Sequence, residues 1–476
     1  MDHNNKPLYN ALIKHKEKNP ISFHVPGHKY GNVFDSEGLN EFRHILNIDA
    51  TELSGLDDLH SPEEAILEAE MMLAELYGVK KSYFLVNGST AGNLAMVMAA
   101  CEENDTVLVQ RNCHKSVLNA LKLAKVKPVF LSPEYDWEWK VAGGVAKETV
   151  IKAMELYPDT RAIILTYPNY YGLGYDLAGI IDLAHRSRIP VLVDEAHGAH
   201  FILGSPFPDS AVNLGADIVV QSAHKTLPAM TMGSYIHFNS EIVPADALED
   251  YLQVFQSSSP SYPIMASLDI ARSYLDTYEK RDLDYLIENI ASFKAELKLI
   301  PQINVLEYQG QQGDPLKMTI QTASKAGGFK IQKLLEKEGI FTELADPYNV
   351  LFIFPLLKEN EEFPWKEAAG KIKKALKGYP LAKSEKVAKH KEIKIAELAI
   401  PYKSMKQLHV TDVPLTEAEG RVSAEMLIPY PPGIPLLLTG EKISGEMIEH
   451  LYELLEHGAR FQGGTLLDQG LIKVFK

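Results

Sequence analysis

The sequence predicts an α/β protein with a large domain built on a mixed, mostly parallel sheet, followed by two smaller α+β domains. Short runs rich in β-branched residues alternate with helical patterns from residue 83 to residue 221. Polar or charged residues follow several of these runs, as at the carboxyl edge of a parallel sheet. With 476 residues, the chain can form two or three domains. Because parallel strands need crossover helices, the alternation indicates a doubly wound sheet covered on both faces.

The large domain is expected to contain six strands, at 83–86, 106–109, 128–131, 162–166, 190–194 and 217–221. We expect four segments along the chain: an N-terminal arm (1–20), the large domain (21–265), a linker helix with a small α/β domain (266–385), and a C-terminal domain (386–476). The arm is expected to form a short helix with Leu8, Leu12 and Ile13 on one face.

The later segments are predicted from pattern and composition. A long charged helix is expected over about 266–299, followed by a β-α-β unit with strands at 316–321 and 349–355 around a helix at 329–338. Residues 366–394 are expected to form a charged helix and linker, and the proline-rich stretch 428–435 a rigid loop before a short α+β piece.

A helix is also expected just after residue 61. Ser61 would be its N-cap, Pro62 would lie in the first turn, and Glu64 would complete a capping box. Gly78 would end it. The apolar face would contain Ala65, Ala69, Leu73 and Leu76.

Composition excludes several classes of protein. The 48 Lys and Arg residues against 63 Asp and Glu give a net charge of -15, which argues against binding to nucleic acids or anionic membranes. The two cysteines, Cys101 and Cys113, provide neither a disulfide framework nor a cysteine-based zinc site. Residues 1–18 have no apolar signal core, and no apolar run approaches the ~18 residues of a membrane span. We therefore expect a cytoplasmic protein.

Three strand ends carry candidate chemical groups. The loop 87–93 joins a strand to a helix, and its small and hydroxyl residues, which include Ser89, Thr90 and Ala91, suit a phosphate at the helix N-terminus. Asp194 directly follows the strand at 190–194, and the last strand leads to Ser222, His224 and Lys225. Each feature alone has a simpler explanation: an N-capped loop, a capping aspartate and a solvated lysine.

Taken together, these groups match the needs of pyridoxal 5′-phosphate. Its phosphate needs a helix N-terminus, its pyridine nitrogen an acidic partner, and its aldehyde a lysine that can form a Schiff base. His114 could stack on the ring, although a structural core histidine is an equal alternative. His197 or His200, with His197 preferred, could hydrogen-bond the phenolic oxygen of the cofactor.

Two other functions suggested by short motifs are not supported. Residues 194–197 spell a helicase box, but the chain has no G-x-x-x-x-G-K-[ST] phosphate loop. The pairs His24 with His28, and His197 with His200, have spacings possible for metal ligands, but neither forms H-E-x-x-H. We therefore expect no metal site.

Five motifs resemble the Orn/Lys/Arg decarboxylase family: Phe23-His-Val-Pro-Gly-His28, Leu56-Asp-Asp-Leu-His60, Arg111-Asn-Cys-His-Lys-Ser116, Val193-Asp-Glu-Ala-His-Gly198 and Ser222-Ala-His-Lys225. The stretch Pro429-Tyr-Pro-Pro-Gly-Ile-Pro435 extends the resemblance. It implies fold type I, the aspartate aminotransferase fold, and a pyridoxal-phosphate enzyme of the short form seen in Gram-positive bacteria.

The resemblance also implies roles for individual residues. Lys225 would hold the cofactor, Asp194 would pair with the pyridinium, and His114 would stack on the ring. Ser89, Thr90, Ser222 and His224 would bind the phosphate. The family's sites lie at a dimer interface, and the segment 256–262, which includes Ser257 and Ser258, resembles one that reaches the phosphate of the partner subunit. Decameric assembly and nucleotide regulation are not implied, because the chain lacks the additional N-terminal domain of the large inducible enzymes and its C-terminal domain is short.

The implied reaction is decarboxylation of lysine, arginine or ornithine to cadaverine, agmatine or putrescine and CO₂, a step of polyamine biosynthesis. Lys225 or His224 would return a proton to the α-carbon. Glu52, Asp57 and Asp58 could form the acidic pocket for the distal cation, or could be solvated loop carboxylates.

Two alternatives remain open at this point. One is an aminotransferase or aldolase with the same cofactor, in which Arg272 or Arg281 could hold a substrate carboxylate. The other is a catalytically inert regulatory paralogue.

Overall fold

The computed structural model describes residues 2–308, 313–382, 394–430, 435–456 and 458–476. The chain forms two compact units. Unit 1 contains residues 1–100, 190–205 and 209–279, and unit 2 contains residues 101–189, 206–208 and 280–476. The predicted domain limits remain a prediction, and the expected boundary at 385/386 lies outside the described residues.

Unit 1 carries four strands that form the sheet order β1-β9-β8-β7. Strands β7 and β8 are parallel, whereas β9 is antiparallel to both β8 and β1. The helices and strands of unit 1 are α1 (Pro7–Glu17), α2 (Leu39–Leu46), α3 (Ala65–Tyr77), β1 (Lys81–Leu85), α4 (Gly88–Ala100), β7 (Val191–Asp194), β8 (Ile218–Gln221), α8 (Ala223–Thr226), β9 (Ser234–Phe238), α9 (Ala245–Phe255) and α10 (Tyr262–Asp276).

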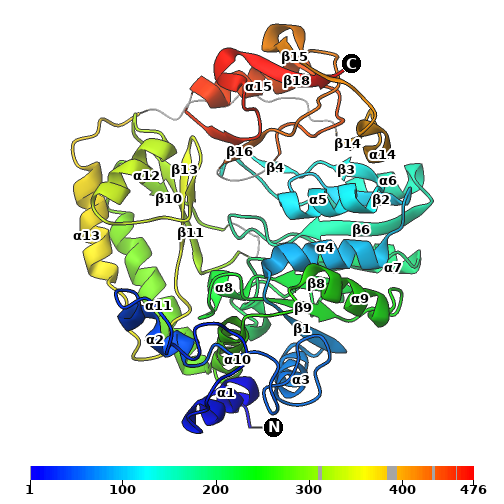
Figure 1. The fold of residues 1–476 in the computed structure, drawn as a ribbon. Coiled ribbons are helices and arrows are strands. Elements are labelled where there is room, and N and C mark those ends of the chain that lie inside the picture. Colours follow the sequence, from blue (N-terminus) through cyan, green and yellow to red (C-terminus); the bar gives the residue numbers. More distant parts are fainter. Residues whose placement is uncertain (1, 309–312, 383–393, 431–434, 457) are drawn as a thin grey trace. The chain divides into compact units, whose positions relative to one another are not determined.

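Helix α4 packs closely on this sheet (Figure 1). Gly92 makes the close approach possible, because a Cβ there would lie 2.7 Å from Leu85 Cδ1 and 3.0 Å from Val220 Cγ1. The helix begins at Gly88, whose φ of +76° is a conformation that glycine adopts at little cost. The turn between β1 and α4 therefore presents the N-terminus of α4 at the edge of the sheet.

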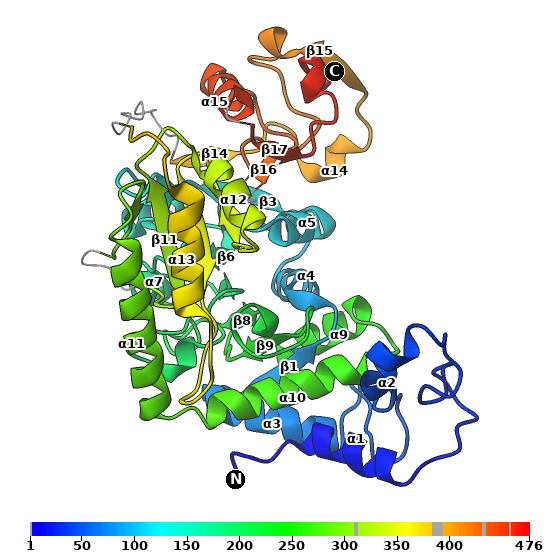
Figure 2. The ribbon, with the colours of Figure 1, turned by 90° about the vertical axis from the view of Figure 1, so that its left-hand side faces the viewer.

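The N-terminal arm is anchored to α10 (Figure 2). Asp269 Oδ2 accepts the backbone N–H of Leu8 at 3.0 Å and of Tyr9 at 3.3 Å, at the start of α1. The fully buried Arg272 donates to the carbonyls of His3 and Asn5 and to Asp269. The predicted arm helix is confirmed, with Leu8 and Leu12 buried and Ile13 partly buried.

Unit 2 contains a second run of strands in the order β6-β2-β3-β14 and a separate sheet in the order β10-β11-β13-β12. Its elements up to β13 are β2 (Thr106–Gln110), α5 (Lys115–Ala124), β3 (Lys127–Leu131), β4 (Tyr135–Asp136), β5 (Val141–Ala142), α6 (Lys147–Leu156), β6 (Thr160–Thr166), α7 (Leu177–Arg186), α11 (Lys280–Leu297), β10 (Ile303–Val305), β11 (Lys317–Thr322), α12 (Gly328–Lys337), β12 (Leu344–Ala345) and β13 (Asn349–Ile353).

The rest of unit 2 contains α13 (Trp365–Leu376), β14 (Ile395–Glu397), α14 (Tyr402–Met405), β15 (Val410–Pro414), β16 (Ile428–Tyr430), α15 (Gly445–Glu456), β17 (Arg460–Gln462) and β18 (Leu471–Phe475). Helices α11 and α13 lie beside the sheet that contains β11 (Figure 2). A small C-terminal core forms around β15, β18 and α15, as the α+β prediction requires.

All six predicted strands of the large domain are present, to within two residues at each end. The sheet is mixed because β2 is parallel to β3 and β6, whereas β14 is antiparallel to β3. The strand β9 was not predicted. A strand signal was available there, because Tyr235, Ile236 and Phe238 form a short β-type run bounded by Gly233 and Asn239.

Four local predictions were wrong. The helix expected over 266–299 is two helices, because α10 ends at Asp276 and α11 begins at Lys280. The small-domain strands β11 and β13 pair antiparallel, so they do not form a parallel β-α-β unit. Residues Ile428–Tyr430 form a strand that pairs with β17, not a loop, and 431–434 lie outside the described residues. The helix predicted in 366–394 is confirmed as α13. The linker predicted after it lies mostly outside the described residues, which omit 383–393.

The fourth error concerns the start of α3. The helix begins at Ala65, and neither Ser61 nor Glu64 caps it with its side chain. Instead Asp57 Oδ2 accepts the backbone N–H groups of Glu64 at 2.8 Å and Ile66 at 2.9 Å. A carboxylate from the preceding loop thus does the work expected of the local capping box, and Gly78 ends the helix in the left-handed conformation as predicted.

Candidate active site

Asp194 is a buried carboxylate at the end of β7, 3% exposed. Asn93 Nδ2, on the buried face of α4, donates to Asp194 Oδ2 at 3.0 Å. The backbone N–H of Ala196 donates to Asp194 Oδ1 at 3.2 Å. Both carboxylate oxygens therefore accept hydrogen bonds from neutral groups, which fixes the orientation of the side chain.

Lys225 lies on α8, the single helical turn that follows β8. Its Nζ is 3.1 Å from His197 Nε2, and the lysine side chain is only partly buried. The neighbouring His224 donates from Nδ1 to the carbonyl of Gly233 at 2.9 Å, which fixes the tautomer of its ring. Because β7 and β8 are parallel neighbours, the turn after one strand and the lysine after the other meet at the same edge of the sheet.

The hydroxyl of Ser222 is a buried polar group that lacks a partner. Ser222 is 0% exposed, and its Oγ has no hydrogen-bond partner among the described residues. The same holds for Thr226 Oγ1. A buried hydroxyl without a partner destabilises the protein unless a ligand completes it. With Ser89, Thr90 and Ala91 at the N-terminus of α4 in the same unit, these hydroxyls are suited to an anionic group.

The residues of unit 1 therefore fit pyridoxal phosphate. They provide an amine at Lys225, a held carboxylate at Asp194, and unsatisfied hydroxyl and helix N-terminal donors. Asn93 was not predicted as a site residue. The available signal was an asparagine on the otherwise apolar, buried face of a helix, which needs a polar partner there.

His114 belongs to unit 2, where it is the N-cap residue of α5. The backbone N–H of Ser116 donates to His114 Nδ1 at 3.3 Å, so a neutral ring carries its proton on Nε2. In the same motif, the guanidinium of Arg111 donates to both carboxylate oxygens of Glu441, at 2.5 and 2.8 Å. This two-point contact attaches the C-terminal segment to the end of β2.

The predicted second-subunit segment is exposed. Ser257 and Ser258 follow α9 and are both solvent-exposed. The carbonyl of Ser257 accepts a hydrogen bond from His60 Nε2 at 2.8 Å. That contact joins the motif at 56–60 to the segment 256–262 within unit 1.

The acidic residues considered for the distal pocket have different environments. Burial acts to raise the pKa of Asp57, but several backbone N–H donors at the start of α3 outweigh it and hold that pKa below its usual value. Asp58 accepts the N–H of His60 at 2.9 Å, and Glu52 accepts the hydroxyl of Thr51. Asp57 therefore has a structural role as a helix cap, whereas Glu52 and Asp58 retain capacity for a further donor.

The arginines considered for a transaminase clamp are already used in other contacts. Arg272 is fully buried and holds the N-terminal arm, as described above. Arg281 Nε lies 3.9 Å from Glu359 on an exposed part of unit 2. Both arginines therefore have partners within their own units.

The histidine pairs make contacts other than metal coordination. His28 Nε2 lies 3.1 Å from Asp49, and His197 contacts Lys225. Within the described part of the chain, no group of three or more His, Cys, Asp or Glu residues could hold a metal ion. No described helix is both long and apolar enough to span a bilayer.

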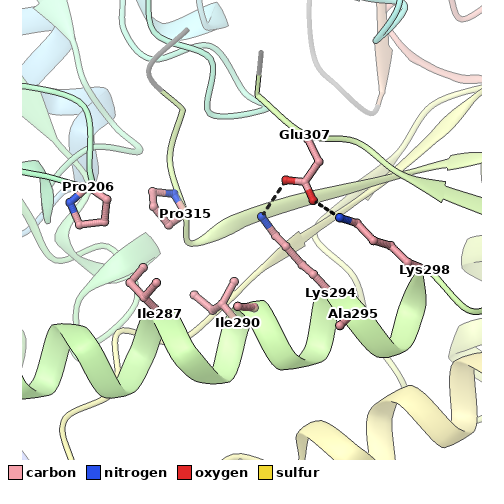
Figure 3. A pocket seen from close by; sticks show the side chains of 9 residues that line it. Pro206, Ile287, Ile290, Lys294, Ala295, Lys298, Glu307 and Pro315 are labelled. Atoms are coloured by element: carbon pink, nitrogen blue, oxygen red, sulfur yellow. Dashed lines mark ion pairs between the residues drawn. The ribbon is translucent and has the colours of Figure 1, made fainter. Parts of the chain in front are cut away.

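A cavity of about 360 Å³ lies along α11 in unit 2 (Figure 3). Ile287 and Ile290 form apolar walls, while Glu307 pairs with Lys298 at 2.8 Å and with Lys294 at 3.9 Å. Burial lowers the pKa of Lys294. The charges of this cavity are already paired with one another and none of the predicted site residues lines it, so we place the candidate site at the strand ends of unit 1.

The chain is similar to known proteins over nearly its whole length. The family model for the Orn/Lys/Arg decarboxylase major domain matches residues 6–312, and the model for the C-terminal domain of the same family matches residues 384–473. The uncharacterized protein YaaO of Bacillus subtilis (strain 168) is 45% identical over 475 residues, covering 99% of this chain and 98% of that protein. The arginine decarboxylase of the same organism is 33% identical over 492 residues, covering 100% and 99%.

Among solved structures, the lysine decarboxylase LdcF of Francisella novicida superposes with a TM-score of 0.82. The match covers 99% of this chain and 81% of that one, at 21% sequence identity. The predicted fold class, a fold-type I large domain with smaller α+β domains, is confirmed.

Proposed function

The chain belongs to the Orn/Lys/Arg decarboxylase family, and from that premise we propose that it is a pyridoxal-phosphate-dependent decarboxylase of a basic amino acid. The products would be CO₂ and the corresponding amine. One observation supports the proposal most directly: the held carboxylate of Asp194, the amine of Lys225 and the unsatisfied hydroxyl of Ser222 follow two adjacent parallel strands.

The cofactor-binding residues are proposed from the family pattern and the local contacts. Lys225 would hold the cofactor aldehyde, Asp194 would face the ring nitrogen, and His197 would contact the phenolic oxygen. The phosphate would be bound by Ser89, Thr90, Ala91, Ser222 and His224. His114 would stack on the ring, and Ser257 and Ser258 would come from a second copy of the chain.

The residues of this chain would contribute to the reaction as follows. Bound pyridoxal phosphate supplies an electron sink for the electron pair left when CO₂ departs. Asp194, fixed by Asn93 and Ala196, would pair with the protonated ring nitrogen and stabilise it. His197 Nε2, 3.1 Å from Lys225 Nζ, can accept or return a proton at that amine. Lys225 or His224 would return the proton to the substrate carbon.

We propose arginine or lysine as the substrate, with ornithine less favoured, because the similar proteins described above are named arginine or lysine decarboxylases. The distal cation would be recognised by Glu52 or Asp58, whose carboxylates are not fully used within the chain. Asp57 is not proposed for this role, because its oxygens accept backbone donors at the start of α3.

We further propose that the protein works as a homodimer with active sites at the subunit interface. Large apolar side chains in the N-terminal segment are exposed, with Ile21 at 87%, Phe23 at 95% and Val25 at 64%. Isolated apolar residues on a surface are ordinary, but three alternating ones, two of them within the motif Phe23 to His28, are suited to contact with a second copy.

The test is direct. Purified protein is supplied with pyridoxal phosphate and incubated separately with lysine, arginine and ornithine, and CO₂ and amines are measured by mass spectrometry. One dominant amine is expected from wild-type protein and from the surface control Lys14→Ala, and none from Lys225→Ala. A keto acid without CO₂ would favour an aminotransferase, and protein without a visible cofactor band would contradict the catalytic proposal.

A further inference from the structure

Glu195, the residue after Asp194, is a fully buried carboxyl group that lies between the ends of β7 and β8. Its Oε2 accepts from Ser210 Oγ at 2.8 Å and from Gln221 Nε2 at 2.6 Å. Its Oε1 accepts the backbone N–H of Ala211 at 2.7 Å. Three donors from two different segments therefore meet on one side chain.

The side chains of Asp194 and Glu195 make separate sets of contacts. Asp194 is bound by Asn93 of α4, whereas Glu195 is bound by Gln221, the last residue of β8. The backbone N–H of Glu195 also donates to Val220 at 2.9 Å. Glu195 thus attaches the turn that carries Asp194 and His197 to the strand that leads into Ser222 and Lys225 by both backbone and side chain.

The turn is packed tightly against this side chain. The N–H of Gly198 donates to the carbonyl of Glu195 at 2.9 Å. A Cβ at position 198 would lie 2.6 Å from Glu195 Cγ and 2.9 Å from Phe201 Cδ2. The turn can follow this path beside the Glu195 side chain because position 198 has no Cβ, so the carboxyl group and the turn are packed against each other.

The hydrogen-bonded chain continues across the sheet. Gln221 Oε1 lies 3.1 Å from His237 Nε2 on β9, and His237 Nδ1 lies 2.8 Å from Ser82 Oγ on β1. Burial lowers the pKa of His237 to about 3, so its ring is neutral near pH 7. We call Glu195, Ser210, Gln221, His237 and Ser82 the Glu195 network.

No cation balances a negative charge on Glu195. The described residues include no lysine, arginine or histidine in an ion pair with it. The titratable groups that face it are Tyr77 of α3, stacked on His237, and His237 itself, reached through Gln221. Burial raises the pKa of Glu195 to about 8, against the opposing effect of its three donors.

We propose that Glu195 is a positioning residue that works as a neutral carboxylic acid, joining the turn of Asp194 and His197 to the strand that delivers Ser222 and Lys225. The inference rests on the function proposed above for Asp194 and Lys225. A neutral Glu195 leaves Asp194 as the single negative charge of the turn.

The network can hold the extra proton if the side-chain amide of Gln221 turns over. The Glu195 hydroxyl donates to the Gln221 carbonyl oxygen once the amide oxygen and nitrogen exchange places. The Gln221 amide then donates to His237 Nε2, and His237 Nδ1–H donates to Ser82 Oγ. Amide orientation and imidazole tautomer are interchangeable at these positions, so each member keeps a partner.

The experiment compares Glu195→Gln, Glu195→Leu and Gln221→Met in the full-length protein. The first readout is the affinity of apoprotein for pyridoxal phosphate, from its visible absorption band, with the pH midpoint of that band. Glu195→Gln should bind the cofactor within about threefold of wild type, since it is neutral and keeps the hydrogen-bonding shape. Glu195→Leu and Gln221→Met should bind at least about tenfold more weakly, as expected for lost buried hydrogen bonds.

The second readout is the urea midpoint of the apoprotein from pH 5 to pH 9, which does not depend on the cofactor. A carboxyl that keeps its proton in the fold but loses it in the unfolded chain makes stability fall as pH rises between these two pKa values. Wild type should therefore lose more stability than Glu195→Gln between about pH 5 and pH 8.

Several outcomes would overturn the inference. Glu195→Gln binding the cofactor as weakly as Glu195→Leu would show that the ionised form is needed. Wild-type affinity in both Glu195→Leu and Gln221→Met would remove the positioning role, and Gln221→Met decides alone if Glu195→Leu does not fold. A wild-type protein without a cofactor band would refute the proposed function, whereas equal pH dependence of apo stability in wild type and Glu195→Gln would refute only the neutral acid.

Discussion

Replacing Ser222 with alanine should change the stability of the apoprotein and the affinity for cofactor in opposite directions. The Ser222 hydroxyl is 0% exposed and has no partner among the described residues, so the apoprotein carries an unsatisfied buried polar group. Alanine removes that group while leaving almost the same volume. A gain of about 1–2 kcal/mol in the unfolding free energy of the apoprotein is expected, the usual cost of one such group.

The same substitution should weaken binding of pyridoxal phosphate. A hydrogen bond from a neutral donor to a charged phosphate contributes about 1.5–3 kcal/mol, which corresponds to a roughly 10- to 100-fold rise in Kd. Apo stability is measured by urea unfolding, and Kd by titration of the visible absorption band. Both measurements use the same apoprotein preparation.

Ser234→Ala is the matched control. Ser234 is also fully buried, but its hydroxyl donates to the carbonyl of Met232 at 3.1 Å. Its loss should destabilise the apoprotein by about 1 kcal/mol, since it breaks a satisfied hydrogen bond. If Ser222→Ala destabilised the apoprotein as Ser234→Ala does, and left the Kd unchanged, the assignment of Ser222 to the phosphate would be wrong.

Three further predictions follow from the described contacts. Asp194→Ala should fold, bind cofactor weakly and lose most decarboxylation, measured by amine production; near-normal turnover would remove Asp194 from its role. Asp57→Ala should lower the unfolding free energy by about 2 kcal/mol through the lost cap of α3, while Asp58→Ala, the control, should change it little; equal effects would refute the cap. Burial raises the pKa of Glu70 to about 8, so folding takes up a proton and stability falls from about pH 4.5 to pH 8; Glu70→Gln should flatten this fall in urea unfolding, and an unchanged slope would contradict it.

The positions of several candidate site residues were predictable, because these residues directly follow apolar stretches that form buried strands. Asp194 and Lys225 each follow a buried β-branched strand, and the parallel arrangement of those strands brings their ends together. The position of the 87–93 loop between a strand and the N-terminus of a helix was also predictable, whereas its role in phosphate binding stays a prediction. Local sequence was sufficient for these residues.

Other features depend on contacts between distant residues. Asn93 faces Asp194 from a helix about a hundred positions earlier in the chain, and Asp57 caps α3 in competition with a well-formed local capping box. The break between α10 and α11 contains no glycine or proline, and the hydroxyl of Thr277 bonds instead to the carbonyl of Ser273 at 2.7 Å. The local sequence does not decide whether such a polar side chain bonds to a nearby backbone group or to a distant residue, because both kinds of contact are open to the same residue type.

The attachment of the N-terminal arm to α10 makes the first few residues part of the folded architecture. The buried guanidinium of Arg272 has backbone carbonyls of His3 and Asn5 among its acceptors, so no side-chain substitution in the arm can remove them. Trimming the chain to the start of α1 would leave the buried charge of Arg272, on α10, with fewer acceptors. Loss of these residues should therefore destabilise the fold, and an affinity tag is better added ahead of them than put in their place.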